Sequence, residues 1–209
     1  MAEPYQIASD IADRVLAMPD EGGRRLIAIA GPPAAGKTTV TQALRTVLSE
    51  RGIASGVVAM DGFHLGNGIL DARGLRTRKG APETFDLAGF ASLLSRLVQG
   101  DEVIAPTFDR RLDASIGSNM VIGPEMSIAL VEGNYLLLDE PGWRDLSEFW
   151  SYTIRLTAPV EELERRLVQR WLKYGFSEEA ARAKALENDI PNARRVEEMS
   201  QSADMTIRE

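Results

Sequence analysis

The sequence predicts an α/β protein with a mostly parallel central sheet, helices on both faces and three layers in all. Short apolar runs, such as LIAIA at 26–30 and IALV at 128–131, are typical of strands buried on both sides. Amphipathic helical patterns alternate with these runs, which is the order of elements in a parallel sheet. The 209 residues are the length of one domain, so we expect a single domain over 1–209.

In the first half of the chain, apolar spacing and breaker residues set the element boundaries. Ile7, Ile11 and Val15 share one helical face, and Pro19 stops that helix. Gly52 and Gly100 follow two further helices, and Asp86 can cap the second of them. We therefore expect helices at 5–18, 37–51 and 87–98, a turn at 21–23, and strands at 26–30, 54–60 and 103–105.

The second half continues the alternation, with strands expected at 128–131 and 152–156. An acidic first turn after Pro159 predicts a helix that runs to about Lys173. A further helix is expected at 177–188, ending before Pro191. The segment 61–86 is too long for a routine connection, and such long segments are usually either functional or disordered.

Composition excludes several classes of function. The chain has no cysteine and one histidine, which rules out thiol chemistry and clusters of several histidines around a metal. A net charge of −7 argues against binding to nucleic acid. No run approaches the ~18 apolar residues of a membrane helix, and the N-terminus lacks a secretory pattern. We expect a cytoplasmic protein with neither a nucleic-acid nor a membrane partner.

The strongest motif directly follows the strand expected at 26–30. It fits the Walker A pattern of a phosphate-binding loop, in which glycines let backbone amides converge on phosphate oxygens at a helix N-terminus. Lys37 can reach the terminal phosphates and the Thr38 hydroxyl can ligate Mg²⁺. The motif therefore predicts a P-loop NTPase fold that binds ATP and Mg²⁺. The nucleotide-binding residues are Gly31, Pro32, Pro33, Ala34, Ala35, Gly36, Lys37, Thr38 and Thr39.

Two carboxylates follow strands that should end at one edge of the sheet, where ligands gather. Asp61 follows the strand at 54–60, and Glu132 follows the strand at 128–131. Phosphoryl transfer to a hydroxyl needs a carboxylate that accepts the proton, and Mg²⁺ needs oxygen ligands. We expect Asp61 to act as the base and to bind the acceptor, and Glu132 and Asp61 to serve the metal or the acceptor. His64 is either a hydrogen-bond donor to the acceptor or a packed imidazole.

These motifs resemble the uridine kinase, phosphoribulokinase and bacterial pantothenate kinase group of P-loop kinases. The resemblance rests on the Walker A motif, Asp61-Gly-Phe-His64, the run from Arg78 to Asp86, Pro106-Thr-Phe-Asp109 and Glu132-Gly133. Within the group, the chain is most similar to bacterial proteins labelled fructose transport system kinases. The resemblance implies that Asp61 is the catalytic base and that Asp86 holds acceptor hydroxyls, a role that can coexist with capping. It also implies that Arg78, Phe108 and Arg110 lie in the acceptor site.

Two departures from the family pattern concern the acceptor. Phe108 stands where uridine kinases have a tyrosine, and Arg110-Arg111 replace residues that help to grip the nucleoside base. Both favour a smaller or anionic acceptor. The helix that carries Arg166 and Arg170 resembles the family's lid, in which arginines stabilise the transferred phosphoryl group. A solvated face paired with nearby glutamates is the alternative. A tail near the adenine makes Asn192 a weaker candidate.

The leading hypothesis is a kinase that transfers the γ-phosphoryl group of Mg·ATP to a hydroxyl of a small molecule, a sugar such as fructose or a sugar-like metabolite. The alternatives are a nucleoside or pantothenate-type kinase and, in a different class, a nucleotide-dependent regulatory switch. We expect a monomer or a homodimer. The expected organisation is an N-terminal helix and turn (1–23), a nucleotide-binding core (24–60), an acceptor-site loop (61–86) and a lid region (about 160–190).

Overall fold

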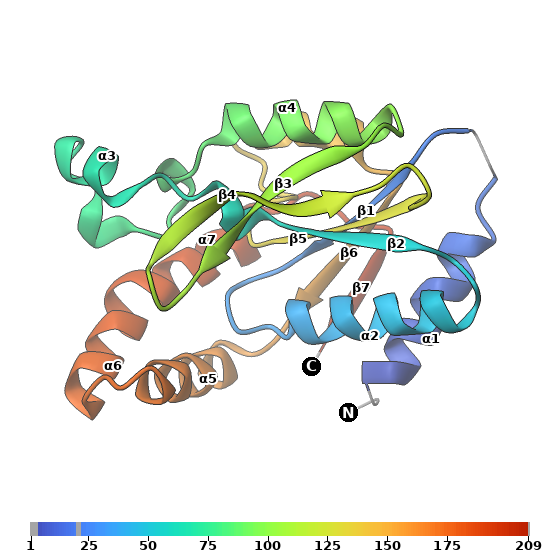
Figure 1. Ribbon diagram of the computed structural model, residues 1–209. Coiled ribbons are helices and arrows are strands. Elements are labelled where there is room, and N and C mark those ends of the chain that lie inside the picture. The colour runs from blue at the N-terminus through green and yellow to red at the C-terminus, as the bar shows by residue number, and fades with distance from the viewer. Residues whose placement is uncertain (1–3, 20–21, 209) are drawn as a thin grey trace.

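The computed structural model describes residues 4–19 and 22–208, and a five-stranded sheet lies at its centre (Figure 1). The strand order is β2-β5-β1-β6-β7, and all neighbouring strands are parallel. This confirms the predicted parallel sheet. Glu21, part of the predicted turn at 21–23, lies outside the described residues. The strands are β1 (Arg25–Ala30), β2 (Ser55–Ala59), β5 (Ile128–Gly133), β6 (Tyr152–Thr157) and β7 (Met205–Arg208).

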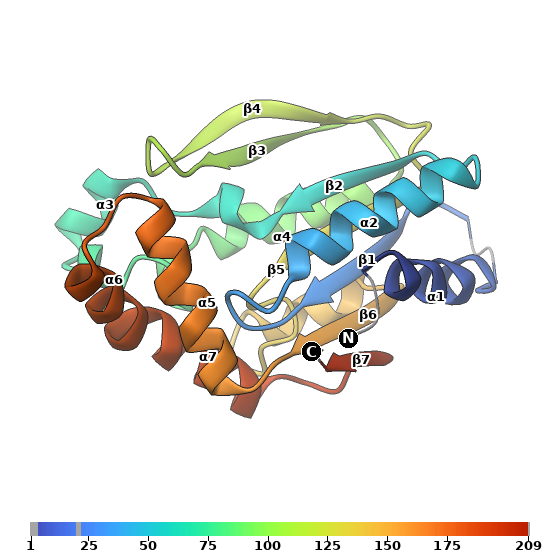
Figure 2. The ribbon, with the colours of Figure 1, turned by 90° about the horizontal axis from the view of Figure 1, so that it is seen from below.

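Helices cover both faces of this sheet, as the sequence predicts (Figures 1 and 2). The side chains of β1 explain why both faces are covered, because they point alternately into two apolar clusters, one on each face of the sheet. Ile27 and Ile29 pack with the helices of one face, and Leu26 packs with the helix of the other. The first face carries α1 (Pro4–Leu16), α2 (Lys37–Glu50) and α5 (Val160–Lys173), and the second carries α4 (Leu87–Val98).

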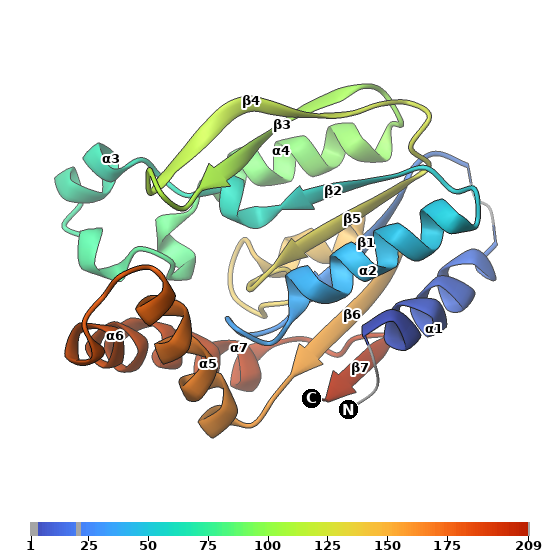
Figure 3. The same ribbon diagram turned by 60° about the horizontal axis from the view of Figure 1, so that its bottom comes forward.

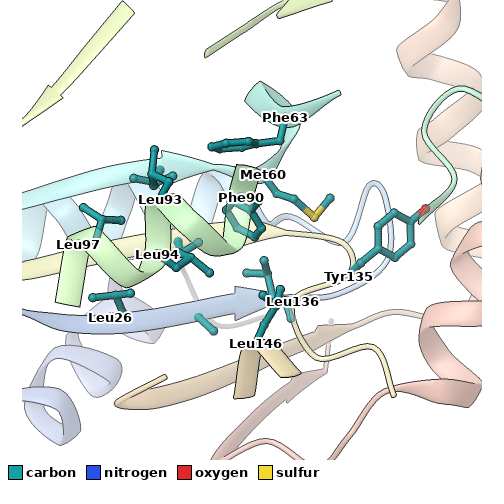
Figure 4. Packing of buried hydrophobic residues seen from close by; sticks show 14 of the residues in the cluster. Leu26, Met60, Phe63, Phe90, Leu93, Leu94, Leu97, Tyr135, Leu136 and Leu146 are labelled. Carbon is teal, nitrogen blue, oxygen red and sulfur yellow. The ribbon is translucent and has the colours of Figure 1, made fainter. Parts of the chain in front are cut away.

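The cluster beneath α4 makes a measurable contribution to stability. Leu94 is fully buried there, and it lies beside Leu93 and Leu97 over β1 (Figure 4). We expect Leu94→Ala to lower the free energy of unfolding by about 2–5 kcal/mol, because the smaller side chain leaves a cavity. Arg96→Ala, at an exposed position on the same helix, should change it by less than about 0.5 kcal/mol. Urea denaturation measures both, and equal effects would contradict the packing shown.

The predicted strand at 103–105 is only the start of a longer one. β3 (Val103–Asp109) pairs antiparallel with β4 (Ala114–Ile122) in a separate two-stranded sheet, which the sequence did not predict. β4 is exposed or half-buried at every position but Ile122 and contains Gly117 and Ser118, so it lacks the apolar pattern of a buried strand. β7 was also missed, because its four residues are too few to show a pattern.

The predicted end of the helix at 177–188 is wrong. α6 (Glu178–Lys184) continues through a π-helical turn, Ala185–Asp189, into α7 (Ile190–Met199). Pro191 is the second residue of α7 and directly follows the π-helical turn, where the hydrogen bonding of the helical path is already irregular. The proline therefore starts the next helical segment and does not end the chain's helical path.

The long segment 61–86 is ordered and mostly made of short helices. These are α3 (Asn67–Ala72) and three 3-10 turns, Met60–Phe63, Arg76–Arg78 and Pro82–Thr84. Figures 2 and 3 show α3, the β3–β4 turn and α6 at the same end of the molecule, where β1 and β2 also end. A site at the strand ends is thus bordered by three separate parts of the chain. Within the described ranges, no helix has the length and apolar character needed to cross a membrane.

Candidate active site

The Walker A residues form a tight loop between β1 and α2. A side chain at Gly31 would place its Cβ 2.3 Å from the carbonyl oxygen of Leu156, so the close approach of β6 requires glycine. Ala34 and Gly36 both adopt a left-handed backbone, with φ of 68° and 84°. α2 then begins at Lys37, and its N-terminal amides face the same side as the loop. Such a curl of backbone amides at a helix N-terminus is a phosphate-binding arrangement.

Lys37 is buried under this loop. Its Nζ donates hydrogen bonds to the carbonyl oxygens of Gly31 and Pro32, at 2.9 and 2.8 Å, and to Oδ1 of Asn134 at 2.7 Å. Burial lowers the pKa of Lys37 to about 8, although Glu132 and Asp61 nearby raise it. Asn134 was not predicted; its place just after β5, at the edge where ligands gather, is the signal that could have found it.

The lowered pKa of Lys37 predicts a pH dependence for ATP binding. With a pKa of about 8, Lys37 of the free protein loses its charge as the pH rises through that region. Phosphate charge favours the ammonium form, so binding should take up protons and ATP affinity should fall as the pH rises above about 8. Calorimetry in two buffers of different ionisation enthalpy measures this uptake. Lys37→Met should abolish it, and equal uptake by both proteins would contradict the assignment.

Thr38 and Glu132 meet beside Lys37. In the sheet register, Glu132 is aligned with Ile29 on β1 and with Ala59 on β2, so it lies between the two strands that lead into the site. The Thr38 hydroxyl donates to Oε1 of Glu132 at 3.2 Å. Oε2 of Glu132 is buried with no hydrogen-bond partner, and burial is the main cause that raises the pKa of Glu132. An unpartnered carboxylate oxygen beside a hydroxyl is the kind of donor set that suits Mg²⁺ and its waters.

Asp61 lies just past the end of β2, and β3 runs directly over it. A Cβ on Gly62 would lie 2.6 Å from the carbonyl oxygen of Pro106, so the Asp-Gly pair serves close packing as well as a turn. Arg110, at the end of β3, donates from Nη2 to Oδ2 of Asp61 at 2.7 Å. The charges of Asp61 and Arg110 also perturb the pKa of Lys37 and Glu132. The structure therefore brings these four predicted residues into one centre.

His64 packs between two phenylalanines. Its ring centroid lies 4.1 Å from that of Phe85 and 4.6 Å from that of Phe108. Because a carbonyl oxygen can only accept, Nδ1 is the donor in its 2.8 Å contact with the backbone oxygen of Asp61. Burial is the main cause that lowers the pKa of His64. The imidazole thus braces the Asp61 turn, and a direct contact with the acceptor stays a prediction.

Three other predicted residues have partners of their own. Arg78 forms an ion pair with Glu83 at 3.1 Å. Asp86 caps α4 by accepting from the backbone N–H of Gly89 at 3.0 Å, which bears out its structural role. Asn192 is 3% exposed in α7. Contacts of these three with acceptor or adenine stay predictions.

The two lid arginines occupy different surroundings. Arg166 donates to Oε1 of Glu162 at 2.6 Å and to the carbonyl oxygen of Ala34, in the phosphate loop, at 3.3 Å. Arg170 is largely buried, and this burial together with the nearby charge of Arg110 lowers its pKa. Both lie along α5, which we expect to act as a lid, so this helix contacts the phosphate loop and lies within electrostatic range of Asp61.

A cleft of about 1070 Å³ runs from the phosphate loop along α5. Its far wall is β7, which contributes Thr206 and Arg208. These two residues were not predicted from the sequence, because the strand itself was missed. Tyr174, just past the end of α5, is a further lining residue that was not predicted. The cleft is large enough for a nucleotide whose phosphates lie on the loop.

Comparison with known proteins agrees with this geometry. Residues 26–208 match the model of the "Phosphoribulokinase / Uridine kinase family". The Escherichia coli K12 protein YggC is 34% identical over 187 residues, which cover 88% of this chain and 77% of YggC. A Schizosaccharomyces pombe protein named "Putative uridine kinase C227.14" is 33% identical, over 89% of this chain and 83% of its own.

A solved structure from Silicibacter sp. TM1040, described as a "putative fructose transport system kinase", is 45% identical. It superposes with a TM-score of 0.92 over 99% of this chain and 100% of its own. The family match spans most of the chain and includes the phosphate loop and both strand-end carboxylates. This chain therefore belongs to the phosphoribulokinase/uridine kinase family and is a P-loop small-molecule kinase, an ATP-dependent phosphotransferase.

Proposed function

We propose that the protein transfers the γ-phosphoryl group of ATP, in the presence of Mg²⁺, to a hydroxyl of a sugar or sugar-like metabolite. One observation carries the proposal: the Asp61 carboxylate lies in the same electrostatic centre as Lys37 and Glu132, beyond the phosphate loop. A carboxylate at that place can orient a hydroxyl and accept its proton.

Each residue of the centre has a role in this reaction. The acceptor oxygen forms a bond to the γ-phosphorus as the bond between that phosphorus and the ADP oxygen breaks, and Asp61 accepts the hydroxyl proton. Lys37 and Arg170 stabilise the phosphoryl charge. Thr38 and Glu132 would hold Mg²⁺, which neutralises phosphate charge when bound. Closure of the lid region would exclude water.

Two observations favour a sugar or sugar-like acceptor. The 45% identical solved structure carries a name that refers to fructose. At Arg110 the chain departs from the pattern with which uridine kinases hold a base, and the structure places this arginine against Asp61. We also propose that the protein acts in the cytoplasm, as a monomer or a homodimer.

The test is an assay of ADP release across a panel of acceptors: D-fructose, D-fructose 6-phosphate, other sugars, uridine and pantothenate. We expect ADP release to depend on a sugar or sugar-like compound. Release that depends only on uridine or pantothenate would reassign the acceptor class. Release that no acceptor increases, together with partner binding that depends on ATP, would identify a regulatory switch instead.

A further inference from the structure

One oxygen of the proposed base is already engaged in this structure. Among the described residues, Arg110 is the only side chain that hydrogen-bonds the Asp61 carboxylate, with Nη2 at 2.7 Å from Oδ2. A carboxylate that is to accept a hydroxyl proton must have an oxygen available to that hydroxyl. The guanidinium therefore holds one of the two oxygens with which Asp61 could receive the acceptor hydroxyl.

The turn that carries Arg110 is held in place at both ends. At one end, Oδ1 of Asp109 accepts from the backbone N–H groups of Arg111 and Leu112, at 2.8 and 2.9 Å. At the other end, Oδ2 of Asp113 forms an ion pair with Lys79 at 2.9 Å. The backbone position of Arg110 is thus set by its neighbours, and the long side chain is the part that can move.

The Arg110–Asp61 pair is weak enough to exchange. The two side chains are 50% and 28% exposed, and exposed ion pairs contribute little because water screens them. Other cations lie close by. Lys79 Nζ lies 5.2 Å and the Arg110 guanidinium carbon 6.0 Å from the centre of the Phe108 ring. The charge of Arg110 also lowers the pKa of Arg170, so these two arginines are near each other. An anion that enters beside Phe108 would meet several positive groups, and Arg110 is the one already placed over the base.

We propose that Arg110 is a latch on Asp61, and that the acceptor carries its own anionic group, a carboxylate or a phosphate, which draws Arg110 away and frees the base. This inference rests on the proposed function, whose acceptor class it narrows. Arg110 exchanges one carboxylate for another anion, so opening the latch costs little net electrostatic energy. The freed Asp61 then accepts the proton of the hydroxyl that attacks the γ-phosphorus.

The latch also limits the hydrolysis of ATP by water. Without an acceptor, Oδ2 of Asp61 remains paired with Arg110, so this oxygen does not take a proton from a water that would attack the γ-phosphorus to give ADP and inorganic phosphate. The same arginine thus binds the correct acceptor and blocks hydrolysis until that acceptor arrives. Binding of the acceptor is measured as kcat/KM for that compound. Restraint of hydrolysis is measured as ATP turnover without any acceptor, so it can be tested before the acceptor is known.

The first experiment measures ATP hydrolysis without acceptor in Arg110→Gln and in the control Arg96→Gln, which removes an exposed arginine on α4. We expect Arg110→Gln to hydrolyse ATP at least about tenfold faster than the unaltered protein, with ADP and inorganic phosphate formed in equal amounts. Adding Asp61→Asn should remove this increase, and Arg96→Gln should not show it. An unchanged rate in Arg110→Gln would overturn the latch.

The second experiment compares matched acceptors: D-glycerate with glycerol, D-fructose 6-phosphate with D-fructose, and pantothenate with pantothenyl alcohol. We expect the charged member of one pair to be phosphorylated, and the identity of that pair distinguishes a carboxylate from a phosphate. Arg110→Gln should lower kcat/KM for that compound by about 10- to 100-fold, the size expected for a lost hydrogen bond between charged groups. Arg96→Gln, at an exposed position on α4, should stay within about twofold.

The outcomes separate this inference from the proposed function. Phosphorylation of a neutral member in preference to its charged partner would overturn the anionic acceptor and leave the kinase assignment in place. ATP hydrolysis that no acceptor converts into ester formation in either protein would overturn the proposed function and, with it, the anionic acceptor. If no pair reacts, the acceptor-free rates of Arg110→Gln and its Asp61→Asn double variant still decide whether the latch exists.

Discussion

Replacing Lys37 with methionine is expected to lower kcat by about 10³-fold. Lys37 is the buried cation beneath the phosphate loop, and it lies between that loop and the carboxylate of Glu132. Hydrogen bonds to Gly31, Pro32 and Asn134 fix the position of its ammonium beside the phosphate loop, and preorganised charges of this kind provide the largest single contribution to many reactions. Methionine keeps the length and apolar stem of lysine but removes the charge.

The measurement is steady-state turnover with saturating ATP, together with far-UV circular dichroism to show that the fold is intact. Arg45→Met is the matched control, because Arg45 is an exposed cation on the same helix, α2. That control should keep its kcat within about twofold, as surface changes away from the site usually do. A Lys37→Met protein that folds and retains more than a tenth of the original kcat would contradict the assigned role.

The second large effect is expected for Asp61→Asn. The amide keeps the size of the carboxylate but does not accept the acceptor proton, so kcat should fall by about 10²- to 10⁴-fold. ATP binding should change little, since Asp61 lies beyond the phosphate loop and follows β2, whereas the loop follows β1. The variant also loses its ion pair with Arg110, which is exposed and contributes little to stability.

Turnover and the ATP dissociation constant must both be measured for this variant. Asp145→Asn, at an exposed position in the 3-10 helix Arg144–Phe149, is the control and should resemble the unaltered protein. A loss of kcat below threefold would remove Asp61 from the role of base. A large loss of ATP affinity with unchanged kcat would place Asp61 on the nucleotide instead.

The parts of the structure that the sequence predicted are those with local causes. The strand at 26–30 is a continuous apolar run because Leu26 and Ile27 are buried on opposite faces of the sheet. The phosphate loop is a contiguous motif. Asp61 lies just past β2 and Glu132 is the last residue but one of β5, and the parallel pairing of these strands brings their ends together. In each case the information lies within about ten residues of the feature.

The parts that were missed depend on partners far away in the chain. β7 is recognisable only through its pairing with β6, and β4 only through its pairing with β3. The contact between Lys37 and Asn134 joins residues 97 apart, and that between Arg110 and Asp61 joins residues 49 apart. No local pattern encodes such pairs, so the sequence could name Arg110 as an acceptor-site residue but not its position over the base.

The most direct test of the central claim is to identify where the γ-phosphoryl group goes. The unaltered protein is incubated with ATP, Mg²⁺ and the acceptor that raises ADP release most, and the products are analysed by ³¹P NMR. The account predicts a new phosphate ester formed in a one-to-one ratio with ADP. ADP accompanied only by inorganic phosphate, with no ester for any acceptor of the panel, would contradict it.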